Sequence, residues 1–155
     1  MRRIPTEAWL FVLILAVNVY AAITPANSLM MNWFSSDDAF YYFKTAQNIS
    51  EGYGITFDRL GRDSGFHPLW MAICVPIFAL ARFDLILPLR IVIIVSGLLS
   101  AGTAVILYRM ARRAISPPAA VLTALFFAFS VFIHNNITKL GLESPLSAFF
   151  LALLF

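Results

Sequence analysis

The sequence predicts an all-α, multi-pass membrane protein with about four crossings and two helices lying along the outer membrane surface. Two observations about composition predict this class. Hydrophobic residues make up 61% of the 155 residues and charged residues only 12%, whereas soluble domains are about a quarter charged. A soluble chain of this length could not hide so much apolar surface, because a domain of this size still exposes much of its area.

The distribution of charge is the third observation. The net charge of +3 would allow a nucleic-acid partner, but the arginines are dispersed or lie at the ends of apolar runs, as they do in membrane helices. We therefore expect the lipid bilayer, and no nucleic acid, as a partner. The single cysteine, Cys74, excludes a disulfide or cysteine-based metal framework.

The first crossing is expected at about residues 8–26. Trp9 and Tyr20 lie near its ends, where interfacial aromatic residues are common, and Arg2 and Arg3 precede it. A basic start, an apolar core and small residues near its end are also typical of a cleaved signal peptide. We favour the uncleaved helix, because the rest of the chain is apolar too.

A polar outer loop, residues 27–84, is expected to contain two juxtamembrane helices. Serines followed by acidic residues predict a helix start for the first, at about 38–51, because both favour helix N-termini. Its apolar residues recur at helical spacing, and we expect this aromatic face to lie on the membrane. The second, at about 67–82, contains Pro68 and Pro76. Its apolar run would reach only about 22 Å, too short for a roughly 30 Å hydrocarbon core.

The later crossings are expected at about 85–110, at about 118–134 and from about 144 onward. Arg109, Arg112 and Arg113 follow the second crossing. The positive-inside rule then places the N-terminus in the cytoplasm and the long loop on the outer face, provided that 67–82 does not cross. The last apolar run stops at Phe155 after about eleven residues, too few to cross. We therefore expect the N-terminal part of a longer protein, with a split gene as the alternative.

The outer loop carries the residues suited to chemistry. Asp37 and Asp38 would act either as simple helix caps or as a general base or metal ligand at the membrane surface. His67 and Arg62 are expected to meet a phosphate. Arg90 lies within the second crossing, where an arginine needs an anionic partner or a route to the surface.

The second outer loop, His134 to Ser144, contributes one more acid. Glu143 would either cap the fourth helix or face the first loop.

A set of local motifs resembles a known superfamily. Residues 37–43 read Asp-Asp-Ala-Phe-Tyr-Tyr-Phe, residues 65–70 read Gly-Phe-His-Pro-Leu-Trp, and Arg90 opens the next crossing. Following a first membrane helix, they resemble the GT-C superfamily of membrane glycosyltransferases, especially the protein O-mannosyltransferase and lipid A aminoarabinose transferase branch. The resemblance implies transfer of a sugar from a polyprenyl-phosphate donor on the outer or lumenal face of the membrane.

The resemblance also implies residue roles. Asp37 resembles the catalytic acid–base residue and Asp38 its acidic neighbour, while Glu143 lies where many members have a second acidic residue. His67 begins a motif that those enzymes place near the donor phosphate, although Leu69 replaces its second proline. Arg90 matches the family arginine.

The resemblance leaves other questions open. A divalent Mg or Mn ion, held by Asp37, Asp38 and Glu143, is possible in some branches. This part alone is expected to be inactive.

Two other classes of function remain open from the sequence. A transporter or channel segment would explain Arg90 and the outer acids as pathway residues. A non-catalytic membrane subunit of a larger complex would explain the short chain. Neither explains the acidic pair together with an aromatic helix between the first two crossings.

Overall fold

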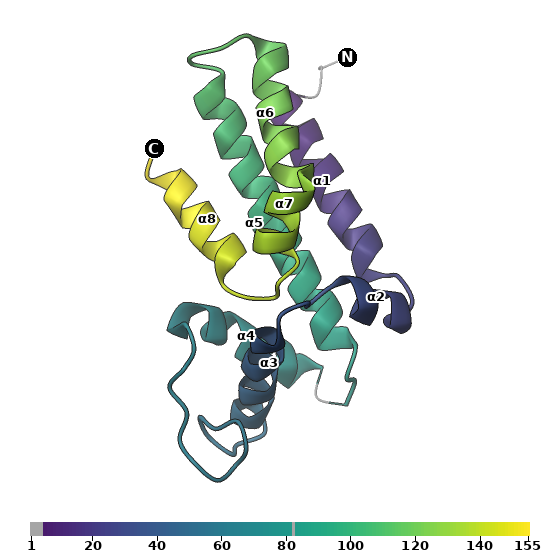
Figure 1. Ribbon diagram of the computed structural model, residues 1–155, viewed down its shortest axis with the longest axis vertical. Helices are drawn as coiled ribbons and strands as arrows, with labels where there is room; N and C mark the ends of the chain where they lie inside the picture. Colours follow the sequence, from purple (N-terminus) through teal and green to yellow (C-terminus); the bar gives the residue numbers. More distant parts are fainter. Residues whose placement is uncertain (1–4, 82) are drawn as a thin grey trace.

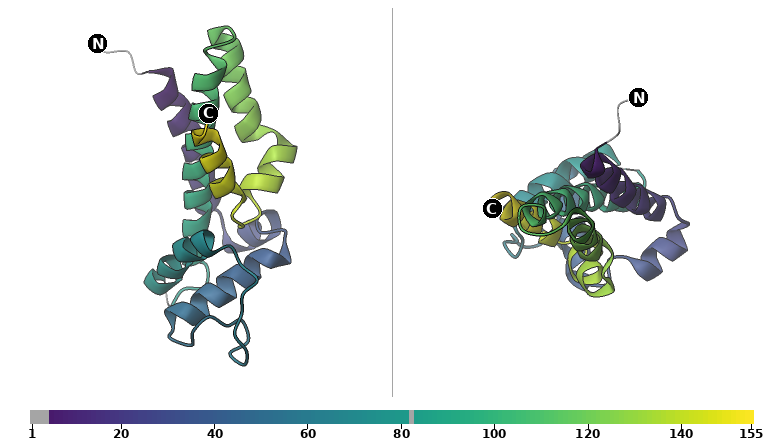
Figure 2. Two further views of the ribbon diagram at one scale, coloured as in Figure 1. Left: turned by 90° about the vertical axis from the view of Figure 1, so that its left-hand side faces the viewer. Right: turned by 90° about the horizontal axis from the view of Figure 1, so that it is seen from above.

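The computed structural model describes residues 5–81 and 83–155, and all regular structure within them is helical. The all-α prediction is therefore confirmed for the described residues. Arg2 and Arg3, and residue 82 of the second predicted juxtamembrane helix, lie outside them. Figures 1 and 2 show an elongated molecule, with a helical bundle at one end and a smaller helical unit at the other.

The bundle consists of α1 (Thr6–Ala22), α5 (Leu87–Ala111), α6 (Pro117–Phe129) and α8 (Ser144–Leu153). The central helix is α5, which contacts the other three. Small side chains on its buried face permit close packing between helices. At Gly97 this closeness is required, because an added Cβ would lie 2.5 Å from the Cβ of Asn18 on α1.

Local signals define the ends of α5. The Asp84 carboxylate accepts hydrogen bonds from the backbone N–H groups of Ile86 and Leu87, at 2.8 and 2.9 Å, and Pro88 lies in the first turn. These hydrogen bonds lower the pKa of Asp84, led by the one from Leu87. Arg109 in the last turn complements the negative end of the helix dipole.

One described helix, α5, is long and apolar enough by itself to cross a membrane, and up to three spans result if each bent helix pair counts as one. One such pair is α1 with α2 (Ala26–Asn32), bent by 116°. The other is α6 followed by α7 (Val131–Ile133) and the π-helix η1 (His134–Thr138), bent by 42°. At ten residues, α8 is shorter than a span.

The bends change two predicted boundaries. The first crossing was expected to continue to residue 26, but α1 ends at Ala22 and Pro25 precedes a separate helix. Proline lacks a backbone N–H and restricts the residue before it, so a helix usually ends there. The third crossing is interrupted at Ser130, whose ψ of 123° is extended.

The smaller unit consists of α3 (Asp37–Ser50) and α4 (Pro68–Leu80), which pack against each other beyond the end of the bundle. Both helices expected within the first loop are therefore present. The expectation that the aromatic face of α3 lies on the membrane is wrong, because this face packs on protein. Tyr42 and Phe43 are buried, and Phe43 stacks on Phe78 of α4 with ring centroids 5.6 Å apart.

Candidate functional site

The acidic pair lies at the exposed start of α3. Asp37 Oδ1 accepts a hydrogen bond from the backbone N–H of Asp38 at 3.1 Å, and Asp38 Oδ2 accepts one from the Ser36 hydroxyl at 3.3 Å. Neither acid forms an ion pair with a described residue. Both carboxylates are thus accessible to a ligand.

A cavity of about 370 Å³ opens beside this pair. It is lined by the two acids and by the rings of Phe40, Tyr41 and Phe57. Aromatic rings offer flat apolar surfaces, and carboxylates accept hydrogen bonds from hydroxyl or amino groups. The cavity therefore combines the two kinds of surface that a polar ring-shaped ligand needs.

An apolar groove of about 710 Å³ adjoins the cavity. Phe40 and Phe57 line both spaces. The remaining lining residues of the groove come from α2, α3, α4, the loop after α3, the segment before α5 and the first turn of α5: Met30, Phe43, Lys44, Gln47, Asp58, Phe78, Leu85, Ile86 and Leu89. A cavity that carries two carboxylates and an apolar groove thus share one aromatic wall.

Tyr42 connects three separate parts of the chain. Its hydroxyl accepts a hydrogen bond from the backbone N–H of His67 at 2.6 Å and donates one to Glu143 Oε2 at 2.8 Å. Burial raises the pKa of Tyr42 to about 12, and the hydrogen bond to Glu143 contributes to the rise. Glu143 precedes α8 but makes no side-chain capping hydrogen bond. The sequence left open whether Glu143 caps the fourth helix or faces the first loop, and in the structure it faces the first loop.

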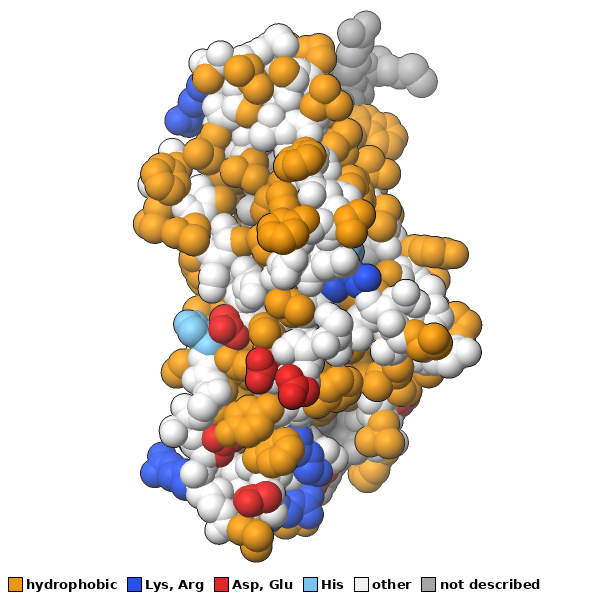
Figure 3. All heavy atoms as spheres, viewed as in Figure 1, with side chains coloured by type: hydrophobic (Ala, Val, Ile, Leu, Met, Phe, Trp, Pro, Cys, Tyr) orange, Lys and Arg blue, Asp and Glu red, His pale blue; other side chains and the backbone are white. Residues whose placement is uncertain are grey.

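Residues 139–143, the second-loop segment, pack on the α3–α4 unit. The indole Nε1 of Trp70 on α4 donates a hydrogen bond to the carbonyl oxygen of Gly141 at 3.0 Å. Just before α3, the backbone N–H of Phe34 donates one to the carbonyl oxygen of Lys139 at 2.9 Å. Figure 3 shows acidic side chains gathered beside a histidine at this level of the molecule. Tyr42 lies one turn after Asp38 in α3 and is bonded to both Glu143 and the backbone of His67, so the acidic pair, His67 and Glu143 all lie around this part of α3, which we call the acidic corner.

The loop between α3 and α4 is fixed by Asn48. Its buried amide donates to the carbonyl oxygens of Thr56 and Phe57 at 2.9 and 2.8 Å, and its oxygen accepts from Arg59 Nε at 3.0 Å. Arg59 also pairs with Glu51 at 2.9 Å and lies over the Tyr53 ring. Arg59 is thus engaged within the loop.

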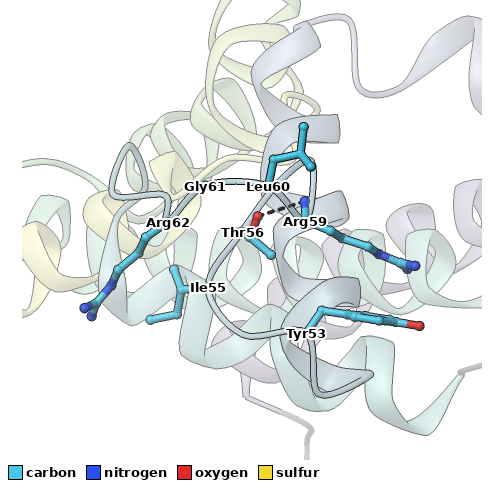
Figure 4. A pocket seen from close by; sticks show the side chains of 7 residues that line it. All are labelled: Tyr53, Ile55, Thr56, Arg59, Leu60, Gly61 and Arg62. Carbon is cyan, nitrogen blue, oxygen red and sulfur yellow. Dashed lines mark hydrogen bonds between the residues drawn. The ribbon is translucent and has the colours of Figure 1, made fainter.

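Arg62 is exposed on the same loop. Residues of the stretch from Tyr53 to Arg62 line a pocket of about 440 Å³, and both Arg59 and Arg62 are among them. In Figure 4 the side chains of these two arginines point in opposite directions. The two arginines therefore do not form a joint phosphate clamp. Arg62 also lines a smaller pocket together with Tyr41 and Asp63.

Tyr41 and Asp63 are polar residues of this region that the sequence reasoning missed. The Tyr41 hydroxyl donates to Asp63, which also accepts from the Thr45 hydroxyl and the Gly65 N–H, each at 3.2 Å. Burial alone would raise the pKa of Asp63, but these hydrogen bonds outweigh it and lower the pKa. The hydrogen bond to Asp63 raises the pKa of Tyr41.

Arg90 lies apart from these contacts. Its guanidinium donates to the carbonyl oxygen of Thr24 at 3.2 Å, in the turn between α1 and α2. Arginine commonly bonds free carbonyls at helix C-termini. Its predicted contact with a donor phosphate remains a prediction.

The metal site considered from the sequence does not fit the structure. Within residues 5–81 and 83–155, no three histidine, cysteine or acidic side chains lie close enough together to hold a metal ion. Asp37, Asp38 and Glu143 are therefore not arranged as a ligand set, and no metal-dependent step follows from them.

Comparisons with protein-family models, with curated proteins and with solved structures find no match to this chain. The acidic pair, the shared aromatic wall and the Tyr42 hydrogen bonds together define the candidate site.

Proposed function

We propose that this chain is part of a membrane glycosyltransferase that moves a sugar from a polyprenyl-phosphate donor to an acceptor on the outer face of the cell membrane. The observation that carries the proposal is the wall of Phe40 and Phe57 shared by the acidic cavity and the apolar groove. A lipid-linked sugar has an apolar chain and a polar ring joined end to end, and two adjoining spaces of these kinds suit it.

The proposed chemistry begins with an exposed carboxylate. Asp37 takes a proton from the acceptor as the acceptor atom attacks the anomeric carbon of the sugar. The bond between that carbon and the phosphate oxygen breaks, and polyprenyl phosphate leaves as an anion. Asp38 stays beside Asp37 as a second hydrogen-bond acceptor for the sugar or the acceptor.

The start of α4 suits the leaving phosphate. His67 is the residue before this helix, and Pro68 occupies its first position. The N-terminus of a helix attracts anions through its free N–H groups and its dipole. His67 and the exposed Arg62 add cationic or donor groups that stabilise the charge developing on the phosphate. Arg90 would first have to leave the Thr24 carbonyl.

The proposed topology follows from the two ends of the molecule. Arg109, Arg112 and Arg113 lie where α5 ends, at the end of the bundle away from α3 and α4. Arginines favour the cytoplasmic side. This supports a multi-pass arrangement with a cytoplasmic N-terminus and the acidic corner on the outer face.

The proposal is tested by sugar transfer from a polyprenyl-phosphate donor in membranes containing the full-length protein. Loss of a general base lowers turnover by about 100-fold or more, so Asp37→Asn should do the same. Glu7→Gln removes a carboxylate at the far end of the bundle and serves as the matched control. Undiminished turnover of the Asp37→Asn protein would overturn the assignment.

A further inference from the structure

The hydrogen bonds of Tyr42 have a fixed direction. A backbone N–H can only donate, so the Tyr42 oxygen must accept from His67. The hydroxyl has one proton, which is therefore available only for Glu143. Glu143 Oε2 must then be an acceptor. The backbone of His67 thus determines the hydrogen-bonding role of a carboxylate more than 70 residues away.

The position of Tyr42 brings this carboxylate toward the acidic pair. Tyr42 follows Asp38 by four residues in α3, so the two side chains lie on the same helix face. Side chains in helices lean toward the N-terminus. The phenol therefore extends toward the end of α3 that carries Asp37 and Asp38, and it bonds Glu143 on that side of its own position.

The three acids of the corner differ in how they are held. Asp37 and Asp38 are exposed and make only local hydrogen bonds with residues 36 and 38. Glu143 is half-buried and bonded to a buried tyrosine from another helix. An acid held in one place is suited to orienting a substrate, whereas an exposed acid is free to exchange a proton.

We propose that Tyr42 is a positioning residue, which holds Glu143 as a fixed hydrogen-bond acceptor at the acidic corner and so orients the bound sugar or acceptor for reaction at Asp37. This inference rests on the proposed glycosyltransferase function. It assigns proton transfer to the exposed pair and orientation to Glu143.

The test combines two substitutions that separate the hydrogen bond from the charge. Tyr42→Phe removes the hydrogen bond and keeps the charge of Glu143. Glu143→Gln removes the charge and keeps an oxygen that accepts from Tyr42. Tyr108→Phe is the matched control, because Tyr108 is also buried and no hydrogen bond of its hydroxyl is found within the described part of the chain.

Transfer is measured with the full-length protein and a polyprenyl-phosphate-linked sugar. We expect Tyr42→Phe to lower kcat about tenfold with little change in KM, since positioning acts mainly in the transition state. Adding Glu143→Gln should lower kcat little further, because the two residues act as a unit. Tyr108→Phe should keep the kcat of the unmodified protein. A Tyr42→Phe protein with unchanged kcat, or with additive effects in the double variant, would contradict the proposal.

A separate measurement distinguishes failure of this inference from failure of the proposed function. The thermal unfolding in detergent of the unmodified protein, the single variants Tyr42→Phe and Glu143→Gln, and the double variant gives a double-mutant cycle for Tyr42 and Glu143. Non-additive changes in Tm without any transferase activity would retain the coupling and reject the function. Normal transferase activity with additive changes in Tm and kcat would retain the function and reject the role of Tyr42.

Discussion

The indole N–H of Trp70 donates a hydrogen bond to the carbonyl oxygen of Gly141 at 3.0 Å, across 71 positions of sequence. This contact joins α4 to the second-loop segment. Gly141 has a φ of +79°, and an added Cβ would lie 2.5 Å from Cδ1 of Phe34 and 3.1 Å from the Phe43 ring. Only glycine combines that backbone conformation with such close approach.

Substitution of Gly141 by alanine should therefore destabilise the protein more than substitution of other loop glycines. The positive φ costs about 1–2 kcal/mol for an alanine, and the overlap with Phe34 adds about 1–3 kcal/mol. Thermal unfolding in detergent measures the effect.

Two other glycines separate these contributions. Gly52 has a φ of +88° but open space around it, and Gly61 has open space with no positive φ. The expected order of destabilisation is Gly141→Ala, then Gly52→Ala, then Gly61→Ala. An equal Tm for the first two variants would contradict the packing described at Gly141.

The loop between α3 and α4 should open when Asn48 loses its donor. In the unmodified protein the Asn48 amide donates to the carbonyl oxygens of Thr56 and Phe57. Asn48→Asp replaces this donor with an oxygen that faces the same two carbonyl oxygens. An unsatisfied buried pair costs about 1–3 kcal/mol, more with a charge. Trypsin should then cleave faster after Arg59 and Arg62. Asn135→Asp, at an exposed position, is the control, and equal cleavage rates would argue against the role of Asn48.

The high pKa of Tyr42 predicts a loss of stability in alkaline solution. Its pKa is about 12 in the folded protein and 10.0 in an unperturbed tyrosine. Because the pKa is higher in the folded protein, the protonated Tyr42 hydroxyl contributes about 2–3 kcal/mol to the free energy of unfolding. This contribution is complete below about pH 10 and is lost between about pH 10 and 12.

The matching measurement compares unfolding of the unmodified and Tyr42→Phe proteins from pH 8 upward. All other titratable groups are the same in both proteins, so the difference in the free energy of unfolding between them isolates Tyr42. The difference should be constant to about pH 10 and then shrink. A difference that stays constant to pH 12 would show that Tyr42 is not held as described.

Helix positions with strong local signals could be predicted from the sequence. The helix expected at 38–51 is α3 (Asp37–Ser50), because acidic residues and a 3–4 apolar spacing mark it. The expected run at 85–110 is α5 (Leu87–Ala111), because hydropathy and flanking charges mark a long apolar helix.

What an apolar face contacts could not be predicted. The face of α3 that includes Tyr42 and Phe43 has the same pattern whether it packs on lipid or on protein, and the structure shows protein. The contact between Tyr42 and Glu143 spans 101 positions. Helical periodicity tells which residues share a face, and it carries no information about partners so distant in the chain.

The topology is testable by cysteine labelling, because the only native cysteine, Cys74, is fully buried. Ser64 lies in the exposed loop of the acidic corner, and Ala114 follows α5 at the other end of the molecule. A maleimide that cannot cross membranes should label Ser64→Cys in intact cells. It should label Ala114→Cys only after the membrane is permeabilised.

The unmodified protein measures any background from Cys74. Labelling of both positions from outside would mean that α4 crosses the membrane, since α5 would then run from the inner to the outer face. At 13 residues α4 spans about 20 Å, less than the roughly 30 Å that a crossing requires. We therefore expect the two positions to lie on opposite sides, with the acidic corner on the side of Ser64.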